Sequence, residues 1–293
     1  MSGIKYKRIL SPSKSPQRYF GVDFFACLFH GSYPGRQYLA SIVDVDQTYR
    51  NEPMLPKTDI IFLFKQELSL KVEGSIIGFY QNPDVYDKLQ ENEGFMRTIL
   101  EIILEKNMGL YLETSSDKVL HDLDILKKIN EKAPVIITVP IAFANDLVQE
   151  KMDFFEPDFT HKLRLIHKLS HETIPVGVIM KPIIPFVNDS EENVREILLK
   201  TKEAGALFVY PTFGIMLFEE QRSSFLDLID KEYPGLKNIF MDTYGNKKSL
   251  ASMNSGKLKK AFVFEAKKLK IPFGMRDIVK SIKPQSETQL KLF

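Results

Sequence analysis

Six short apolar segments of strand type recur along the chain, and segments with helical spacing separate most neighbours. The strand-like segments are 20–26, 75–79, 109–113, 135–139, 176–180 and 206–210. Strands that alternate with helices pair in parallel, because the crossover helix returns the chain to the same end of the sheet. The sequence therefore predicts an α/β protein, an incomplete (β/α)6 TIM-like barrel with C-terminal helices.

The chain divides into three predicted regions. Residues 1–19 are rich in Ser, Pro, Lys and Arg and are expected to form an N-terminal arm, packed on the surface or partly loose. Residues 20–275 contain the partial barrel, and residues 276–293 lose the core pattern, which is typical of a flexible tail. Apolar spacing predicts helices at 59–70, 94–106, 119–129, 145–151, 161–171, 191–204, 218–232, 236–243 and 256–270.

Composition excludes several kinds of protein and site. The single cysteine, Cys27, excludes an internal disulfide and any iron–sulfur or zinc site built on several thiolates from this chain. No apolar run is long enough to cross a bilayer, and the N-terminus lacks the apolar region of a signal peptide, so we expect no membrane contact and a cytoplasmic location. The net charge of +2 is too small to indicate nucleic-acid binding by itself.

One segment is locally basic. Six lysines fall between Lys257 and Lys270, on a predicted helix that also carries Phe262 and Phe264. This pattern is open to two interpretations, a patch for nucleic acid and an ordinary solvated helix face. We favour the solvated face.

Lysine and histidine supply the candidate reactive groups. Lys181 directly follows the strand 176–180, where a barrel presents side chains to its active end, and a desolvated lysine there can form a Schiff base. The sequence shows no carboxylate or tyrosine partner for it, so a surface or salt-bridged lysine is the favoured interpretation. His167 and His171 are spaced to share a helix face for a metal, but the pair lacks the acid of H-E-x-x-H, and a solvated face is favoured.

The loop after the first predicted strand resembles a known cofactor motif. Cys27-x3-Gly31-x2-Pro34 has the spacing of the C-x3-C-x2-C signature of radical S-adenosylmethionine (SAM) enzymes, with the second and third cysteines replaced. In that superfamily three thiolates hold a [4Fe–4S] cluster whose open iron binds SAM. Glycine and proline offer no side-chain ligand, so the resemblance implies that these three positions mark a vacated cluster site.

Further stretches resemble one branch of that superfamily, the spore photoproduct lyase-like or DNA repair photolyase-like proteins. Residues 115–126 resemble their T-K-S-x-x-x-x-R-D-x-x-L-L stretch, and residues 182–189 resemble their P-x-x-P-x-x-x-D stretch. Residues 204–206 match the A-G-A before the sixth strand. The resemblance covers residues 20–275 and implies a barrel of radical SAM type.

The same resemblance places a former SAM pocket, altered at several positions. The corresponding residues of this chain are Tyr80, Asn82, Ser115 and Asp153. We expect them to line a remodelled pocket for a nucleotide or a lesion. No cofactor is expected, because cluster ligands and cofactor contacts have changed together.

The C-terminus carries a second resemblance. Its last five residues resemble the bacterial sliding-clamp-binding pentapeptide Q-L-x-L-F, with Gln289, Leu290, Leu292 and Phe293 at the defining positions. An extended tail could place the last two residues in an apolar pocket, while the glutamine makes polar contacts at its edge. The alternative is an amphipathic end that docks on its own barrel. The polar linker before the motif favours the clamp.

These expectations describe a cluster-free, radical-SAM-like bacterial protein of DNA repair or replication, with the sliding clamp as partner and DNA as a candidate ligand. Whether it is an enzyme stays open, although an active radical SAM enzyme is not the favoured interpretation. The alternatives are a barrel enzyme with cluster-independent chemistry at Lys181, an enzyme that still binds SAM and recruits a cluster with outside ligands, and a plain scaffold.

Overall fold

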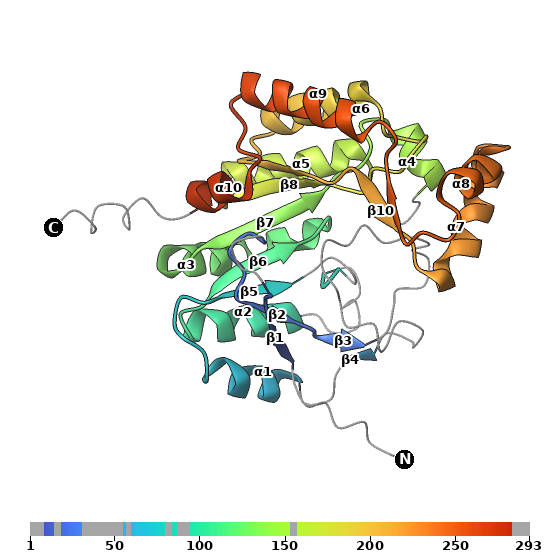
Figure 1. The fold of residues 1–293 in the computed structure, drawn as a ribbon. Coiled ribbons are helices and arrows are strands. Elements are labelled where there is room, and N and C mark those ends of the chain that lie inside the picture. Colours follow the sequence, from blue (N-terminus) through green and yellow to red (C-terminus); the bar gives the residue numbers. More distant parts are fainter. Residues whose placement is uncertain are drawn as a thin grey trace, which may run out of the picture.

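A computed structural model gives the fold (Figure 1). It describes residues 9–14, 19–30, 55–56, 60–79, 84–86, 94–152 and 157–282. In these ranges no helix combines the length and the apolar character that a membrane span requires.

A seven-stranded sheet with the order β1-β2-β5-β6-β7-β8-β9 forms the centre of the molecule. All neighbours from β2 to β9 pair in parallel, and β1 adds an antiparallel edge strand next to β2. The strands are β1 (Leu10–Pro12), β2 (Phe24–Ala26), β5 (Ile76–Phe79), β6 (Gly109–Glu113), β7 (Val135–Pro140), β8 (Val176–Met180) and β9 (Val209–Pro211). The six predicted parallel strands and the α/β partial barrel are confirmed.

Helices connect the parallel strands and cover the outside of the sheet (Figure 1). They are α1 (Ile60–Leu68), α2 (Phe95–Glu105), α3 (Leu123–Lys132), α4 (Asp146–Met152), α5 (Phe159–His171), α6 (Glu191–Glu203), α7 (Glu219–Glu232), α8 (Leu236–Tyr244), α9 (Ser255–Lys268) and α10 (Met275–Ile282). A 3-10 turn, η3 (Asp117–Asp122), precedes α3. Side chains of residue types that favour N-caps begin two of the helices. At α5, Asp158 accepts a hydrogen bond from the backbone N–H of His161 at 2.6 Å, and at α6, Ser190 accepts one from that of Asn193 at 3.1 Å.

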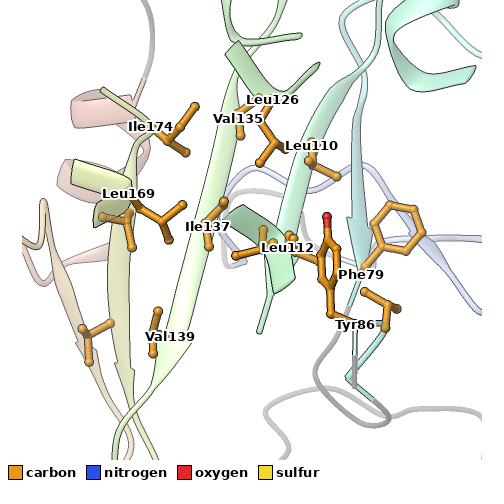
Figure 2. Packing of buried hydrophobic residues seen from close by; sticks show 14 of the residues in the cluster. Phe79, Tyr86, Leu110, Leu112, Leu126, Val135, Ile137, Val139, Leu169 and Ile174 are labelled. Atoms are coloured by element: carbon orange, nitrogen blue, oxygen red, sulfur yellow. The ribbon is translucent and has the colours of Figure 1, made fainter. Parts of the chain in front are cut away.

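The strands send alternate side chains to two different cores. Toward the helices, residues such as Leu110, Leu112 and Ile137 pack against Leu126 of α3 and Leu169 of α5 (Figure 2). Each fully buried aliphatic side chain contributes about 1.5–3 kcal/mol to this outer core. The outer core therefore holds the helices in place and leaves the inner face of the sheet for other residues.

The inner face is filled by aromatic and β-branched side chains. Phe20 stacks on Tyr111 with ring centroids 5.1 Å apart, and it contacts Phe208 at 5.5 Å. Gly177 of β8 makes room for this layer, since a Cβ there would lie 2.3 Å from the Phe208 ring. Ile278 of α10 belongs to the same cluster. The turn before β2 and helix α10 thus close one end of the barrel.

Ordered elements extend past both ends of the expected barrel range, residues 20–275. The flexible tail was expected from residue 276, but α10 extends to Ile282, and its Ile278 and Ile282 are buried because they face the inner core. The N-terminal arm contributes β1 to the sheet and buries Tyr19 among the inner aromatic rings. Both segments pack through a few apolar residues within an otherwise polar sequence.

A smaller unit lies at the opposite end from α10 (Figure 1). It combines α7 and α8 with the strand pair β10 (Gly214–Met216) and β11 (Ser249–Ala251). Its core includes Phe143 and Ile184, which lie in the loops after β7 and β8. This unit therefore marks the carboxyl end of the parallel strands. A further short pair joins β3 (Phe29–His30) to β4 (Leu55–Pro56).

Candidate functional site at the carboxyl end of the barrel

Polar side chains occupy the inner face of three adjacent strands near their carboxyl ends. Glu113 is the last residue of β6 and lies opposite Thr138 of β7 in the ladder, and Lys181 follows the last residue of β8. Each is two residues beyond an inner-core residue of its own strand, so alternation places all three on the inner face. Barrel enzymes build their sites from residues in these positions.

An ion pair between β6 and β8 is the centre of this site. Lys181 Nζ lies 2.7 Å from Glu113 Oε1, and the two side chains are 11% and 2% exposed. Among the described residues, the glutamate is the one polar partner of this ammonium group. A lysine ammonium carries three donors, and among the described residues Glu113 takes one of them.

Hydroxyl groups extend the network below the ion pair. Thr138 Oγ1 donates to the Tyr111 hydroxyl at 3.0 Å, and that hydroxyl lies 3.4 Å from Glu113 Oε2. The Tyr19 hydroxyl lies 3.4 Å from that of Tyr111. Burial raises the pKa of both phenols well above the usual value, so both stay protonated at neutral pH. The network thus joins the ion pair at the carboxyl ends of the strands to the aromatic cluster inside the barrel.

The sequence-based expectation for Lys181 is corrected in one respect. The lysine is salt-bridged, as favoured, but a carboxylate and a tyrosine do complete its surroundings. The sequence analysis did not identify Glu113 as the partner of Lys181. Both faces of β6 are buried, so an apolar strand pattern does not tell which of its residues face the inside of the barrel. The usable signal was its placement at the end of a predicted barrel strand, two residues after Tyr111.

A second buried carboxylate organises the segment after β6. Asp84 accepts hydrogen bonds from the Thr114 hydroxyl at 2.8 Å, the backbone N–H of Ser115 at 3.0 Å and the backbone N–H of Tyr86 at 3.0 Å. Asp84 is 4% exposed, and Thr114 and Ser115 are fully buried. The candidate pocket residue Ser115 is therefore fixed next to Glu113 by a charge-assisted network.

The loop after β8 is held by side-chain amides. Asn188 accepts from the backbone N–H of Ile184 at 2.6 Å and donates to the carbonyl groups of Ala142 at 2.8 Å and Pro182 at 3.0 Å. It thereby ties the loop after β7 to the loop after β8. Ser252 Oγ donates to Asp189 at 2.6 Å and connects the same loop to the unit of α7 and α8. These bonds fix the backbone on which Lys181 sits.

Most of the other predicted site residues lie outside the described part of the chain. This applies to the pocket candidates Tyr80, Asn82 and Asp153, to the cluster positions Gly31 and Pro34, and to the C-terminal motif residues Gln289, Leu290, Leu292 and Phe293. The structure therefore places Ser115 alone of the four pocket residues. The predicted tail motif stays a prediction.

The chain does not fit a cluster held by three thiolates. Cys27, its single cysteine, is exposed one residue beyond β2. Within the described ranges, no group of three or more His, Cys, Asp or Glu side chains is arranged to hold a metal ion. His167 and His171 lie on the exposed face of α5 with ring centroids 6.4 Å apart. The favoured solvated face is confirmed for this pair.

No protein-family model matches the chain. Uncharacterized proteins of Mycobacterium tuberculosis and Mycobacterium bovis are 22% identical to it over 222 residues. The match covers 75% of this chain and 64% of each relative, so the chain spans less than two thirds of the curated relatives it matches.

Solved structures of spore photoproduct lyase share the fold. A cysteine-to-serine mutant of that enzyme superposes with a TM-score of 0.65 at 12% identity and covers 90% of this chain and 78% of its own. The complex of the enzyme with dinucleoside spore photoproduct gives 0.62 at 13% identity, with 91% and 78% covered. At this level of identity the likeness establishes the fold alone. The partial barrel thus shares the fold of spore photoproduct lyase, in agreement with the fold that the sequence stretches implied.

Proposed function

We propose that this chain is a cluster-free relative of the radical-SAM-fold proteins that binds a ligand at the carboxyl end of its barrel and acts in DNA repair or replication. The observation that carries the proposal is the presence of one cysteine on a fold whose family cluster requires three. Binding without cluster chemistry uses the remaining polar groups of the barrel.

The ion pair supports a binding role for the carboxyl end of the barrel. Glu113 and Lys181 together carry no net charge, yet they offer an acceptor and donors side by side. Such a pair suits a ligand that presents a donor and an acceptor on neighbouring atoms, because both buried charges then stay partnered. Nucleobases and amides have this arrangement. We therefore place a nucleotide or a lesion at this end of the barrel.

Anaerobic reconstitution with iron and sulfide tests the absence of a cluster. We expect a desalted sample to retain no stoichiometric iron or sulfide and to form no 5′-deoxyadenosine from SAM after reduction. The Cys27→Ser variant is the control, because it should behave like the unaltered chain. A cluster that forms in the unaltered chain, is lost in the variant and cleaves SAM would sink the proposal in favour of an enzyme that recruits outside ligands.

Recruitment to DNA by the sliding clamp is the second part of the proposal, supported by the C-terminal residues Gln289, Leu290, Leu292 and Phe293. Calorimetric titration against the clamp of the source organism tests it. We expect binding by the full chain, and none by a form truncated after Thr288 or by Leu292→Ala/Phe293→Ala. Lys291→Ala is the matched control, since that position varies in the motif. Equal binding by the truncated form would remove the clamp from the proposal.

Cluster-independent chemistry at Lys181 is a second candidate function, favoured by Glu113 at 2.7 Å. The ammonium would pass one proton to Glu113, and the neutral amine would add to a carbonyl carbon and lose water to give an imine. Borohydride would trap the imine as a secondary amine. Mass spectrometry should then find the adduct on Lys181 and not on exposed lysines such as Lys132. Unselective labelling, or full ligand binding by Lys181→Ala, would contradict this function.

A further inference from the structure

Helix α9 has one buried face and one basic face. Its buried residues pack in the outer core against the helix layer, where α6 is its neighbour (Figure 1). They are Leu258, Ala261, Phe262 and Ala266. Because these residues fix the helix, its other side faces solvent, away from the barrel interior.

The solvent side of α9 carries a line of residues spaced three or four apart. All of them are exposed, and we call them the α9 stripe: Lys257, Lys260, Phe264, Lys267 and Lys268. Residues at this spacing are neighbours on a helix surface. Two lysines of the stripe thus precede Phe264 along the helix, and two follow it.

The positive charges of the stripe are poorly neutralised. In the described part of the chain, Lys257, Lys260 and Lys267 have no ion-pair partner, while Lys268 lies 3.4 Å from Glu265. The Glu265 side chain is 15% exposed and also lies 3.8 Å from Arg195 of α6. The one carboxylate of α9 is thus shared by two cations and leaves the stripe with a positive surface.

Three lysines elsewhere on the molecule have a carboxylate partner. Lys65 of α1 lies 2.8 Å from Glu105, and Lys237 of α8 lies 2.8 Å from Asp227. On α6, next to the stripe, Lys200 lies 3.1 Å from Glu203. The stripe differs from these surfaces because α9 carries a single acid, Glu265, among its lysines, so the stripe attracts a polyanion rather than completing pairs within the fold.

Phe264 gives the stripe its second property. Its side chain is 67% exposed, whereas Phe262, two residues earlier, is 1% exposed in the outer core. An aromatic ring left in water between ammonium groups offers a face on which a base can stack while phosphates reach the lysines. Duplex DNA hides the faces of its bases, so this combination suits a single strand.

We propose that the α9 stripe binds single-stranded nucleic acid, with the lysines on the phosphates and Phe264 stacked on a base. This surface is separate from the ligand site in the barrel. The inference rests on the proposed role in DNA repair or replication for its biological meaning, but its physical basis is the stripe alone.

Fluorescence anisotropy of the full chain with a labelled oligothymidylate tests the inference. The variant Lys257→Gln/Lys260→Gln/Lys267→Gln should bind about tenfold or more weakly at low salt. Its plot of log K against log salt should be flatter by about 2, because each lysine on a phosphate of a single strand adds about 0.7 to the slope. Phe264→Ala should weaken binding about tenfold without changing the salt slope. Thermal melts would confirm that these surface changes leave the fold intact.

The matched control is Lys128→Gln/Lys132→Gln/Lys247→Gln, which removes the same charge from exposed lysines elsewhere. It should retain most of the affinity. Equal weakening in both triple variants would overturn the inference, because overall charge would then explain the binding. Binding of anionic vesicles in place of the oligonucleotide would overturn it as well.

Failure of the inference and failure of the proposed function are distinguishable. A chain that binds the clamp but no oligonucleotide would overturn the inference and leave the clamp role standing. Selective loss of oligonucleotide binding in the stripe variant, with no clamp binding by the full chain, would support the stripe and remove the clamp.

Discussion

Two short ion pairs of this protein have similar geometry and opposite surroundings. Inside the barrel, Lys181 Nζ lies 2.7 Å from Glu113, with side chains 11% and 2% exposed. Outside, Arg97 of α2 holds Asp124 of α3 with two hydrogen bonds of 2.5 and 2.6 Å, and the side chains are 36% and 54% exposed. Distance alone would rank the outer pair first. When one partner is removed, however, the inner pair should lose more stability than the outer pair, because water can solvate the charge that remains outside.

The reason for the reversal is the fate of the remaining charge. Water can solvate Asp124 or Arg97 once the other is gone, and Arg97 also lies 3.4 Å from Asp122 and 3.7 Å from Glu101. Glu113 has no comparable alternative among the described residues, because its side chain is almost fully buried and its second oxygen is approached by Tyr111 only at 3.4 Å. The inner pair is thus an obligatory unit, and the outer pair is one of several exchangeable contacts.

Removal of the lysine alone should have the largest effect. Lys181→Met keeps a side chain of similar length but leaves Glu113 buried without a cation, which costs about 3–5 kcal/mol. The midpoint of urea unfolding should fall accordingly at pH 7. A destabilisation below about 1 kcal/mol would mean that water reaches the pair and that the inner and outer pairs do not differ.

The double variant Glu113→Leu/Lys181→Met separates the value of the pair from the cost of breaking it. Replacement of both charges by apolar groups removes the unpaired carboxylate, so we expect most of the lost stability to return. The two single changes would then be strongly non-additive. Additive destabilisation would show that each residue acts through other neighbours.

A smaller effect is expected one layer deeper. Tyr111→Phe removes the hydroxyl group that accepts from Thr138 at 3.0 Å and lies 3.4 Å from Tyr19. It should cost about 1 kcal/mol in the free energy of unfolding, and up to about 3 kcal/mol if Thr138 finds no other partner. Chemical unfolding measures this change. An unchanged free energy would show that the hydroxyl chain below the ion pair does not stabilise the barrel.

The sequence predicted the strands and most helices because their apolar residues repeat with the period of each element. It could not pair Glu113 with Lys181, because the two residues lie on strands separated by β7 and meet only through the sheet order. Asp84 was missed as a centre of hydrogen bonding for the same reason, since its partner Thr114 is distant in the chain. Helix α10 was missed because its Ile278 and Ile282 form a short apolar face within a polar segment.

The outer pair should show the smallest effect and a distinct pH dependence. Hydrogen bonds from Arg97 lower the pKa of Asp124 to about 2, from 3.8. The folded state therefore favours the carboxylate, and the pair's contribution is complete above pH 4 and is lost as the pH falls toward 2. Asp124→Asn lacks this titration.

The stability difference between Asp124→Asn and the unaltered chain should thus be small and constant at neutral pH, and it should close as the pH falls through that window. Urea unfolding at a series of pH values measures it. Glu131→Gln on the same helix is the matched control, because Glu131 has no ion-pair partner among the described residues. We expect only a small difference because Arg97 stays exposed to water when Asp124 loses its charge. A difference as large as that of Lys181→Met would show that the two pairs have equivalent surroundings.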